Sequence, residues 1–210
     1  MNREHIKYAI IGIAIILSAY LLGRAYTYKY RSQDTVVVTG LGETEFESDL
    51  IVWSGVLTAE AAEAAGYTQI ARLFRATSEA EQVHIAMEYK LVQAEDPEWA
   101  KPVADAPVVE ACDLNLIAAA NGEIYETSDM YPAFIKKAQE EGNDKAVRVF
   151  TRAKLAESVH AERYMEAYNN IDAADDDAYF LCPVCGYIEK GDDFEVCPIC
   201  GAKKSAFKQF

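Results

Sequence analysis

A glutamate followed three residues later by a histidine occurs twice in this chain, and this repeat constrains the fold more than any other feature. The copies are Glu81-Gln-Val-His84 and Glu157-Ser-Val-His160, and they use every histidine beyond His5. At this spacing on a helix, a carboxylate and an imidazole project from one face and can hold one metal ion together. Between the copies lies Glu123-Ile-Tyr-Glu126, two carboxylates at the same spacing. The three motifs predict a helical bundle with a metal site in its core.

A single Glu-x-x-His on an acidic helix more often marks a solvated surface, which is the alternative interpretation. Here the faces that carry the motifs are otherwise apolar or small, with Ala80, Ala119 and Ala156 among their residues. Carboxylates buried on such faces are costly unless they are paired or metal-bound. A bundle of this kind supplies a glutamate from each of two helices and Glu-x-x-His from each of the other two. This oxygen-rich ligand set favours two iron or manganese ions over zinc.

Four cysteines near the C-terminus form a second metal-binding pattern. They occur as Cys182-Pro-Val-Cys185 and Cys197-Pro-Ile-Cys200, and a glycine, Gly186 or Gly201, follows each pair. Glycine permits the positive φ of a tight turn whose backbone N–H groups face the sulfurs. Four thiolates fit tetrahedral zinc or a single iron, and the alternative is two disulfides. The close pairing in a small module favours a metal, although the spacing alone does not separate iron from zinc.

Periodicity and turn signals divide the middle of the chain into four helices. The predicted ranges are 47–65, 68–92, 112–141 and 144–169. Gly66 is expected to end the first helix, and Pro132 to kink the third. The proline-rich connection before the third helix is the crossover that such a bundle requires. The chain is therefore predicted to be mainly α-helical.

The N-terminal residues have a different character. Residues 8–23 are apolar and uncharged, and residues 1–34 carry five basic against two acidic side chains in a chain of net charge −14. Such a run predicts an uncleaved transmembrane helix, with a cleaved signal peptide as the alternative. Positive charges flank the run on both sides, so they do not set its orientation. The acidic remainder argues against binding to nucleic acid, whose phosphates it would repel.

Together, the helical and cysteine motifs resemble the rubrerythrin family. The similarity covers residues 59–210 and is most specific in 66–84, 115–134 and 179–187. It implies a ferritin-like four-helix bundle with a non-haem di-iron centre, followed by a small rubredoxin-like domain with mononuclear iron. It also implies a peroxidase that acts in oxidative stress and reduces hydrogen peroxide to water. Electrons would pass to it from NAD(P)H through a reductase or rubredoxin, and then from the cysteine-bound iron to the di-iron centre.

The resemblance also implies roles for individual residues. The di-iron ligands would be Glu81, His84, Glu123, Glu126, Glu157 and His160. Tyr131 would assist catalysis by orienting one of the ligand carboxylates. The mononuclear iron, with zinc as the alternative, would be bound by Cys182, Cys185, Cys197 and Cys200. Family members pair head to tail, which implies a homodimer in which one subunit's rubredoxin-like domain serves the other's di-iron centre.

The chain departs from the family pattern in its first helix. Rubrerythrins have a further glutamate ligand there, and Ser48 occupies the corresponding position, with Glu47 and Asp49 on either side. A shift of one residue turns a helical side chain by about 100°, so neither neighbour is an automatic replacement. Either would serve if the helix is re-phased, and another chain could also supply the ligand. Without a replacement, the alternative function is a non-catalytic electron carrier or iron-binding protein.

Residues 36–55, with the apolar run before them, resemble the opening of the SIMPL-domain proteins of bacterial envelopes. The predicted organisation is a membrane anchor (1–33), a SIMPL-like strand and linker (34–46), the di-iron bundle (47–170), an acidic linker (171–178) and the rubredoxin-like domain (179–210). The rubrerythrin resemblance implies the cytoplasmic side of the membrane, whereas the leader implies the opposite side. The chain is therefore expected to be membrane-anchored, with its orientation left open.

Overall fold

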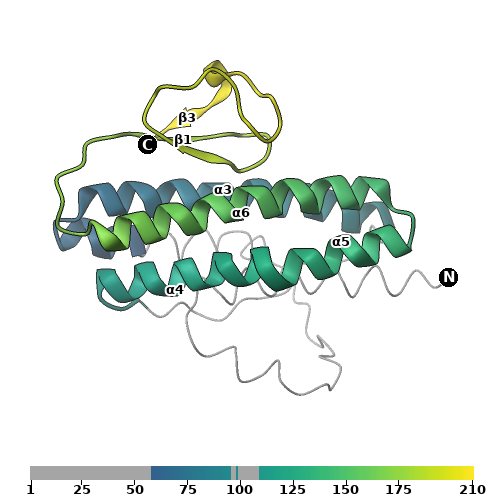
Figure 1. The fold of residues 1–210 in the computed structure, drawn as a ribbon, viewed down its shortest axis with the longest axis horizontal. Helices are drawn as coiled ribbons and strands as arrows, with labels where there is room; N and C mark the ends of the chain where they lie inside the picture. The colour runs from purple at the N-terminus through teal and green to yellow at the C-terminus, as the bar shows by residue number, and fades with distance from the viewer. Residues whose placement is uncertain (1–57, 96–97, 99–108) are drawn as a thin grey trace.

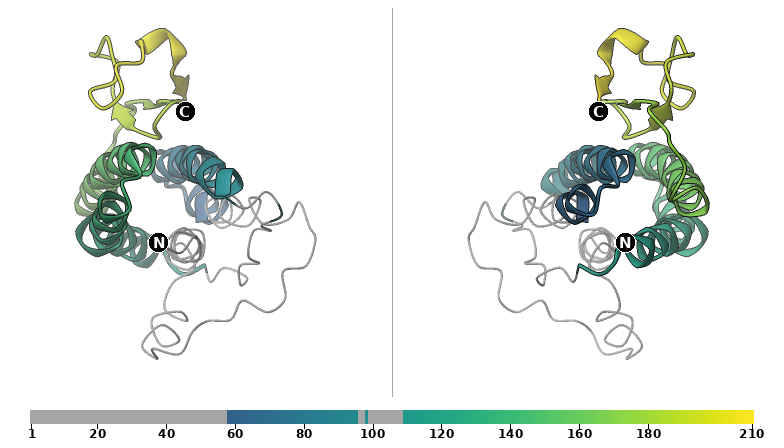
Figure 2. Two further views of the ribbon diagram at one scale, coloured as in Figure 1. Left: turned by 90° about the vertical axis from the view of Figure 1, so that its right-hand side faces the viewer. Right: turned by 90° about the vertical axis from the view of Figure 1, so that its left-hand side faces the viewer.

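The computed structural model describes residues 58–95, 98 and 109–210. Its long helical elements are α3 (Thr68–Glu95), α4 (Cys112–Tyr125), α5 (Tyr131–Glu140) and α6 (Asp144–Asn169), and residues 58–64 are also helical. The helices run side by side along the long axis, and the C-terminal module lies against α3 and α6 (Figure 1). Seen end-on, α4 and α5 lie on the side of α6 away from the module (Figure 2).

Several sequence predictions fall outside the described residues. These are the transmembrane helix, the SIMPL-like segment, most of the proline-rich crossover, and the first-helix positions Glu47, Ser48 and Asp49. Among the residues that the structure does describe, none of the helices has both the length and the apolar character needed to cross a membrane.

The helices α3 and α6 follow the predicted ranges closely. The segment before α3 ends in a turn at Gly66, whose φ of 89° is the left-handed conformation that favours glycine. The helix α6 begins after Asn143, whose side chain accepts a hydrogen bond of 3.0 Å from the backbone N–H of Ala146. Such a cap satisfies one of the free donors at a helix start. Local capping and stop signals therefore set the ends that the sequence indicated.

The predicted third helix is irregular at its centre. Between α4 and α5 lies a π-helical segment, η2 (Glu126–Met130), and the Tyr131 N–H donates to the carbonyl of Glu126, five residues back. Pro132 follows directly, near the start of α5. Proline has no N–H, and its ring clashes with the carbonyl four residues back in an ordinary α-helix. The wider π turn accommodates it, and such turns occur often at functional sites.

The C-terminal module is a small antiparallel sheet in the order β2-β1-β3. Its strands are β1 (Tyr179–Leu181), β2 (Ile188–Lys190) and β3 (Lys208–Gln209), and a short 3₁₀ turn, η3 (Lys204–Ala206), precedes the last strand. The first cysteine pair lies in the connection from β1 to β2, and the second in the longer excursion between β2 and η3. This is the arrangement expected of a rubredoxin-like domain.

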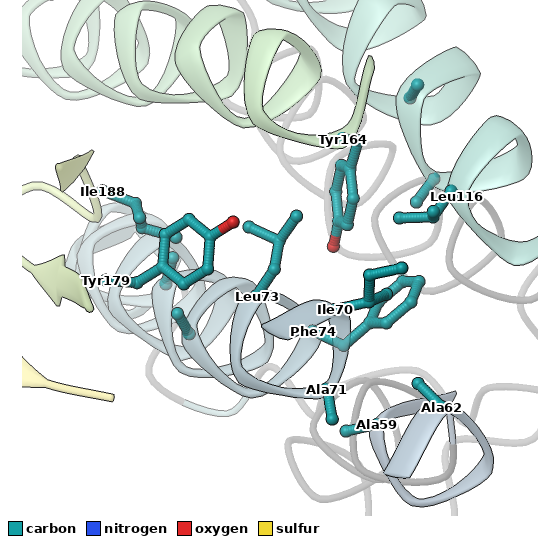
Figure 3. Close-up of a cluster of buried hydrophobic side chains, with 14 of the residues drawn as sticks. Ala59, Ala62, Ile70, Ala71, Leu73, Phe74, Leu116, Tyr164, Tyr179 and Ile188 are labelled. Carbon is teal, nitrogen blue, oxygen red and sulfur yellow. The ribbon is translucent and has the colours of Figure 1, made fainter. Parts of the chain in front are cut away.

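An apolar core joins this module to the bundle. Tyr179 and Ile188 from the sheet belong to the same buried cluster as Leu73 and Phe74 of α3 and Tyr164 of α6 (Figure 3). Burying a large apolar side chain stabilises a protein by about 1.5–3 kcal/mol. At the edge of this contact, Lys190 pairs with Glu166 of α6 at 2.6 Å. The module and the bundle therefore share one buried apolar core.

Candidate metal centres

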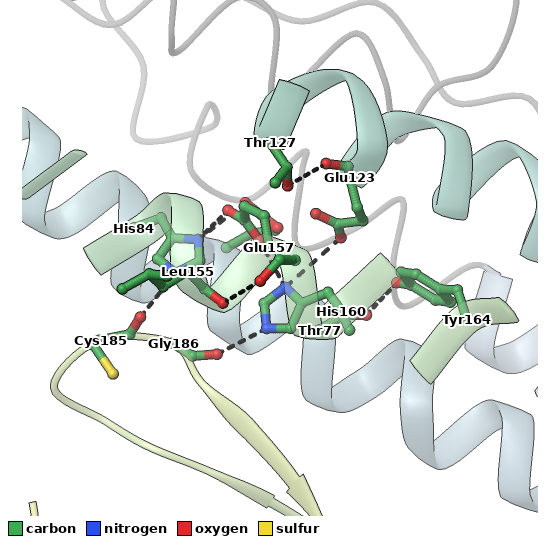
Figure 4. A network of polar contacts seen from close by, with 12 residues as sticks. Thr77, His84, Glu123, Thr127, Leu155, Glu157, His160, Tyr164, Cys185 and Gly186 are labelled. Atoms are coloured by element: carbon green, nitrogen blue, oxygen red, sulfur yellow. Dashed lines mark hydrogen bonds and ion pairs between the residues drawn. The ribbon is translucent and has the colours of Figure 1, made fainter. Parts of the chain in front are cut away.

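Three helical elements bring the six predicted di-iron ligands into the interior of the bundle. The helix α3 carries Glu81 and His84, the α4–η2 junction carries Glu123 and Glu126, and α6 carries Glu157 and His160. None of the six is more than 5% exposed. Figure 4 shows the two histidines with Glu157 between them and Glu123 close by. The three motifs therefore meet in one place, as their helical spacing predicts.

Glu157 lies between the two histidines. Its Oε1 is 2.6 Å from Nδ1 of His84, and its Oε2 is 2.7 Å from Nδ1 of His160. Each histidine has a second carboxylate at 3.7 Å, which is Glu81 for His84 and Glu123 for His160. The two imidazole rings are nearly parallel, with centroids 5.9 Å apart. This pseudo-symmetric arrangement would hold two adjacent metal ions, with Glu157 able to serve both.

The cysteine module fixes the orientation of both histidines. Nε2 of His84 lies 3.0 Å from the carbonyl oxygen of Cys185, and Nε2 of His160 lies 2.9 Å from that of Gly186 (Figure 4). A carbonyl only accepts hydrogen bonds, so both Nε2 atoms carry the proton and donate it. Once each imidazole is neutral, its lone pair is on Nδ1, which faces the carboxylates. Partners of this kind hold a ligand histidine in the tautomer that a metal requires.

The buried polar atoms of this cluster fit a metal centre. Three buried carboxylate oxygens lack a hydrogen-bond partner, namely Glu81 Oε2, Glu123 Oε2 and Glu126 Oε2, and Nδ1 of each histidine faces only carboxylate oxygens. Such orphaned atoms are costly in a protein interior, and metal coordination satisfies them. A set rich in carboxylate oxygen with one imidazole per position suits iron or manganese.

The structure brings some predicted ligands closer together than others. One ligand atom each from Glu81, Glu123, Glu157 and His160 lies within 4.8 Å of the rest. His84 lies beside this set through its contacts with Glu81 and Glu157. Glu126 is buried at the start of η2, where the negative charges of Glu157 and Glu123 raise its pKa. Among the ion pairs of the described residues, none joins Glu126 to a histidine.

Burial and opposing charges shift the pKa values of the cluster. Burial raises the pKa values of Glu123 and Glu126 well above the usual range, and nearby Glu157 raises them further. Burial opposes a charged imidazole, but Glu157 outweighs it and raises the pKa of His160 to about 10 and that of His84 well above normal. The metal-free cluster therefore holds protons at neutral pH that a metal must displace.

We expect metal loading of the bundle to release about two or more protons per chain at pH 7, because both imidazoles must become neutral to bind. The apparent affinity should rise with pH from 6 to 8, since the pKa of His160 is about 10. Calorimetry in two buffers of different ionisation enthalpy counts the protons, using protein already loaded at the four-cysteine site. An affinity that does not change with pH would show that these groups are unprotonated in the metal-free protein.

Tyr131 contacts a carboxylate, but not one of the predicted ligands. Its hydroxyl donates a 2.9 Å hydrogen bond to Oε1 of Glu88, and both side chains are buried. Glu88 is not among the residues predicted from the sequence. It lies four residues after His84 and seven after Glu81, so it shares their face of α3. Extending the helical spacing by one turn beyond the Glu-x-x-His motif would have found it.

The four cysteines also come together as predicted. Their sulfurs lie within 4.8 Å of one another, with 3.5 Å from Cys182 to Cys200 and from Cys185 to Cys197. Both separations far exceed a disulfide bond of about 2.05 Å, and they suit four sulfurs about 2.3 Å from a shared ion. The pKa of Cys182 falls to about 5, because the Cys185 thiol and the backbone N–H groups of Val184 and Cys185 interact with its sulfur. The predicted N–H groups therefore face this site.

Comparisons with known proteins agree with both centres. The family model described as rubrerythrin matches residues 57–168, and the one described as its rubredoxin-like domain matches residues 180–208. Nigerythrin from Nitratidesulfovibrio vulgaris is 66% identical over 152 residues, which are 72% of this chain and 75% of that protein. Rubrerythrin-2 from Clostridium acetobutylicum is 33% identical over 174 residues, or 80% of this chain and 91% of that protein. A solved structure of fully reduced, all-ferrous nigerythrin has a TM-score of 0.75 at 53% identity and covers 93% of this chain and 85% of its own.

Proposed function

Because the chain belongs to the rubrerythrin family, we propose that it is a non-haem iron oxidoreductase that reduces hydrogen peroxide to water. The overall change is the addition of two electrons and two protons to peroxide, which breaks the O–O bond and gives two water molecules. The chain provides a di-iron carboxylate–histidine site in the bundle and a rubredoxin-like four-cysteine site. The observation that carries the proposal is the direct contact between these two sites.

That contact gives electrons a short route between the centres. Cys185 offers a sulfur to the four-cysteine site, and its own carbonyl accepts the hydrogen bond from His84. The carbonyl of the next residue, Gly186, accepts the one from His160. Each metal position in the bundle is therefore one hydrogen bond away from the cysteine knuckle. An electron donor placed in this way suits a redox centre rather than an iron store.

The residues of the bundle hold and shield the reaction site. When bound, the di-iron centre supplies the two electrons that peroxide receives. Glu157 would hold both metal positions at once, and Nδ1 of His84 and of His160 would each bind one of them. Glu81 and Glu123 complete the two sides, and Glu126 offers a further carboxylate from η2. The burial of all six keeps bulk water from the reacting atoms.

Metal analysis combined with peroxide turnover tests this function. Protein reconstituted with iron under anaerobic conditions should contain about three irons per chain and consume peroxide when supplied with a reductase and NAD(P)H. One iron per chain, with no peroxide consumption, would instead identify an electron carrier. Asp49→Ala and Glu47→Ala variants show whether either residue supplies the first-helix ligand, because loss of iron from the bundle in one of them identifies the replacement.

We propose that electrons arrive from NAD(P)H through a reductase or rubredoxin, and that the chain pairs head to tail as a homodimer. In the single chain the module docks on its own bundle, so a head-to-tail pair would have to exchange modules in order to form these contacts between subunits. Anchoring through residues 1–33 is a separate proposal, and cell fractionation of the full chain tests it.

A further inference from the structure

Glu88 is a buried carboxyl group next to the di-iron site that is not one of the six ligands. It lies on α3 one turn beyond His84 and is 4% exposed. Its Oε1 accepts the 2.9 Å hydrogen bond from Tyr131, which is fully buried at the start of α5. A hydrocarbon side chain would occupy such a position without the desolvation penalty of a carboxyl group. Packing alone does not explain a glutamate at this position.

The surroundings of Glu88 keep it protonated. The charged and titratable groups that act on it are His84 and Glu81 from its own helix, Glu157 from α6, Glu126 from η2 and Tyr131 from α5. His84 and the hydrogen bond from Tyr131 lower the pKa of Glu88, whereas Glu157 and Glu81 raise it, and burial is the largest effect. Burial therefore raises the pKa of Glu88 to about 8. In the metal-free chain this carboxyl group therefore carries a proton at pH 7, next to the site where peroxide reduction consumes two.

The ligands themselves are poorly suited to supply that proton. Both histidines would bind metal through Nδ1, and their Nε2 protons are held by the carbonyls of Cys185 and Gly186. The ligand carboxylates must lose their protons in order to bind metal. Among the described residues, Glu88 is the buried acid near the centre that is not needed as a metal ligand, so it can keep its proton.

We propose that Glu88, acting through Tyr131, is a proton donor for peroxide reduction at the di-iron site. This inference rests on the proposed function. The Tyr131 hydroxyl, which donates to Glu88 in this structure, first turns so that it accepts from the protonated Glu88 and donates toward peroxide. As the O–O bond breaks, it gives its proton to a peroxide oxygen and takes the proton of Glu88 in its place. The two electrons come from the reduced irons, and the second proton comes from water. Water then returns a proton to the Glu88 carboxylate, so that the pair is restored for the next turnover.

The variant Glu88→Gln separates proton donation from packing. Glutamine keeps the shape of the side chain and the oxygen that accepts from Tyr131, but it has no acidic proton. In single turnover of reduced, iron-loaded protein with peroxide, the rate should fall roughly 10²-fold, the lower range for the loss of a general acid. Tyr131→Phe should give a similar loss, and Glu88→Asp should keep part of the rate. Glu140→Gln, on the exposed surface of α5, is the control and should react like the wild type.

Two further readouts do not respond to packing. The wild-type rate should decline with rising pH as Glu88 loses its proton, and the Glu88→Gln rate should not show this decline. The infrared difference spectrum between wild type and Glu88→Gln at pH 7 should contain the C=O stretch of a protonated carboxyl group. Iron content should be equal in both proteins, because Glu88 is not a ligand.

The inference is overturned if Glu88→Gln reacts as fast as the wild type, if it loses iron from the bundle, or if the carboxylic acid band is missing. Failure of the proposed function has a different signature. In that case the wild type itself does not react with peroxide, and the proton-donor role fails with it. When the wild type reacts and the variant matches it, only the role of Glu88 is wrong.

Discussion

Replacing Glu157 by alanine should empty both metal positions of the bundle and leave the four-cysteine site loaded. Glu157 contacts Nδ1 of His84 and of His160 at 2.6 and 2.7 Å, so its loss removes the group shared by the two positions. Iron should fall from about three to about one per chain, and peroxide turnover should fall to the background rate. Metal analysis with the visible spectrum of the cysteine-bound iron measures both effects.

The exposed Glu162 provides a matched control on the same helix. Glu162→Ala should keep full iron content and turnover, since its carboxylate faces solvent. Glu157→Gln should resemble Glu157→Ala, because a neutral amide does not supply the bridging charge. If Glu157→Ala retains about two irons in the bundle, Glu157 is not the shared ligand and the two-position arrangement is wrong.

Replacing Gly186 by alanine should break the contact between the cysteine knuckle and the bundle. A methyl group there would lie 2.1 Å from Nε2 of His84 and within 2.9 Å of two ring carbons. The φ of 78° adds backbone strain of about 1–2 kcal/mol for a residue other than glycine. If the cysteine knuckle moves away from the bundle, the two histidine–carbonyl hydrogen bonds are also broken. Each of them contributes about 0.5–1.5 kcal/mol to stability. Electron transfer to the bundle should slow by about tenfold or more.

Gly201 offers an internal control because it occupies the same position in the second knuckle. Its φ is 77°, yet an added methyl group would meet nothing within 4 Å. Gly201→Ala should therefore show the backbone strain alone. The difference between the two variants in melting temperature, and in the rate at which peroxide oxidises the cysteine-bound iron, isolates the contact with His84. Equal effects in both variants would mean that the module does not dock on the histidines in this way.

The features that depend on short-range spacing could be predicted from the sequence. The interval of three residues in Glu81–His84 and Glu157–His160 places each pair on one helical face, and in the structure the two pairs meet through the contact of His84 with Glu157. The limits of α6 follow from a cap at Asn143, which is likewise local. The cysteine spacing and its two glycines define the knuckles for the same reason, with positive φ at Gly186 and Gly201.

The features that depend on long-range packing could not be predicted in this way. No local pattern shows that Glu157 bridges the two histidines or that Cys185 and Gly186 present their carbonyls to them, because these contacts join distant parts of the chain. The π turn before Pro132 depends on how the chain relieves the proline clash, and the sequence indicated only that an irregularity is needed there. Glu88 becomes notable only once its burial and its hydrogen bond to Tyr131 are known.

The central claim is that electrons pass from the cysteine-bound iron through the bundle site to peroxide. The most direct test is rapid-mixing absorbance of the cysteine-bound iron after peroxide is added to fully reduced protein. In the wild type, this iron should be oxidised promptly, with the red ferric spectrum appearing as peroxide is consumed. In Glu157→Ala, which keeps the four-cysteine site but lacks the bundle irons, it should stay reduced on the same timescale. Equally fast oxidation in both proteins would contradict the claim, because peroxide would then react without the bundle site.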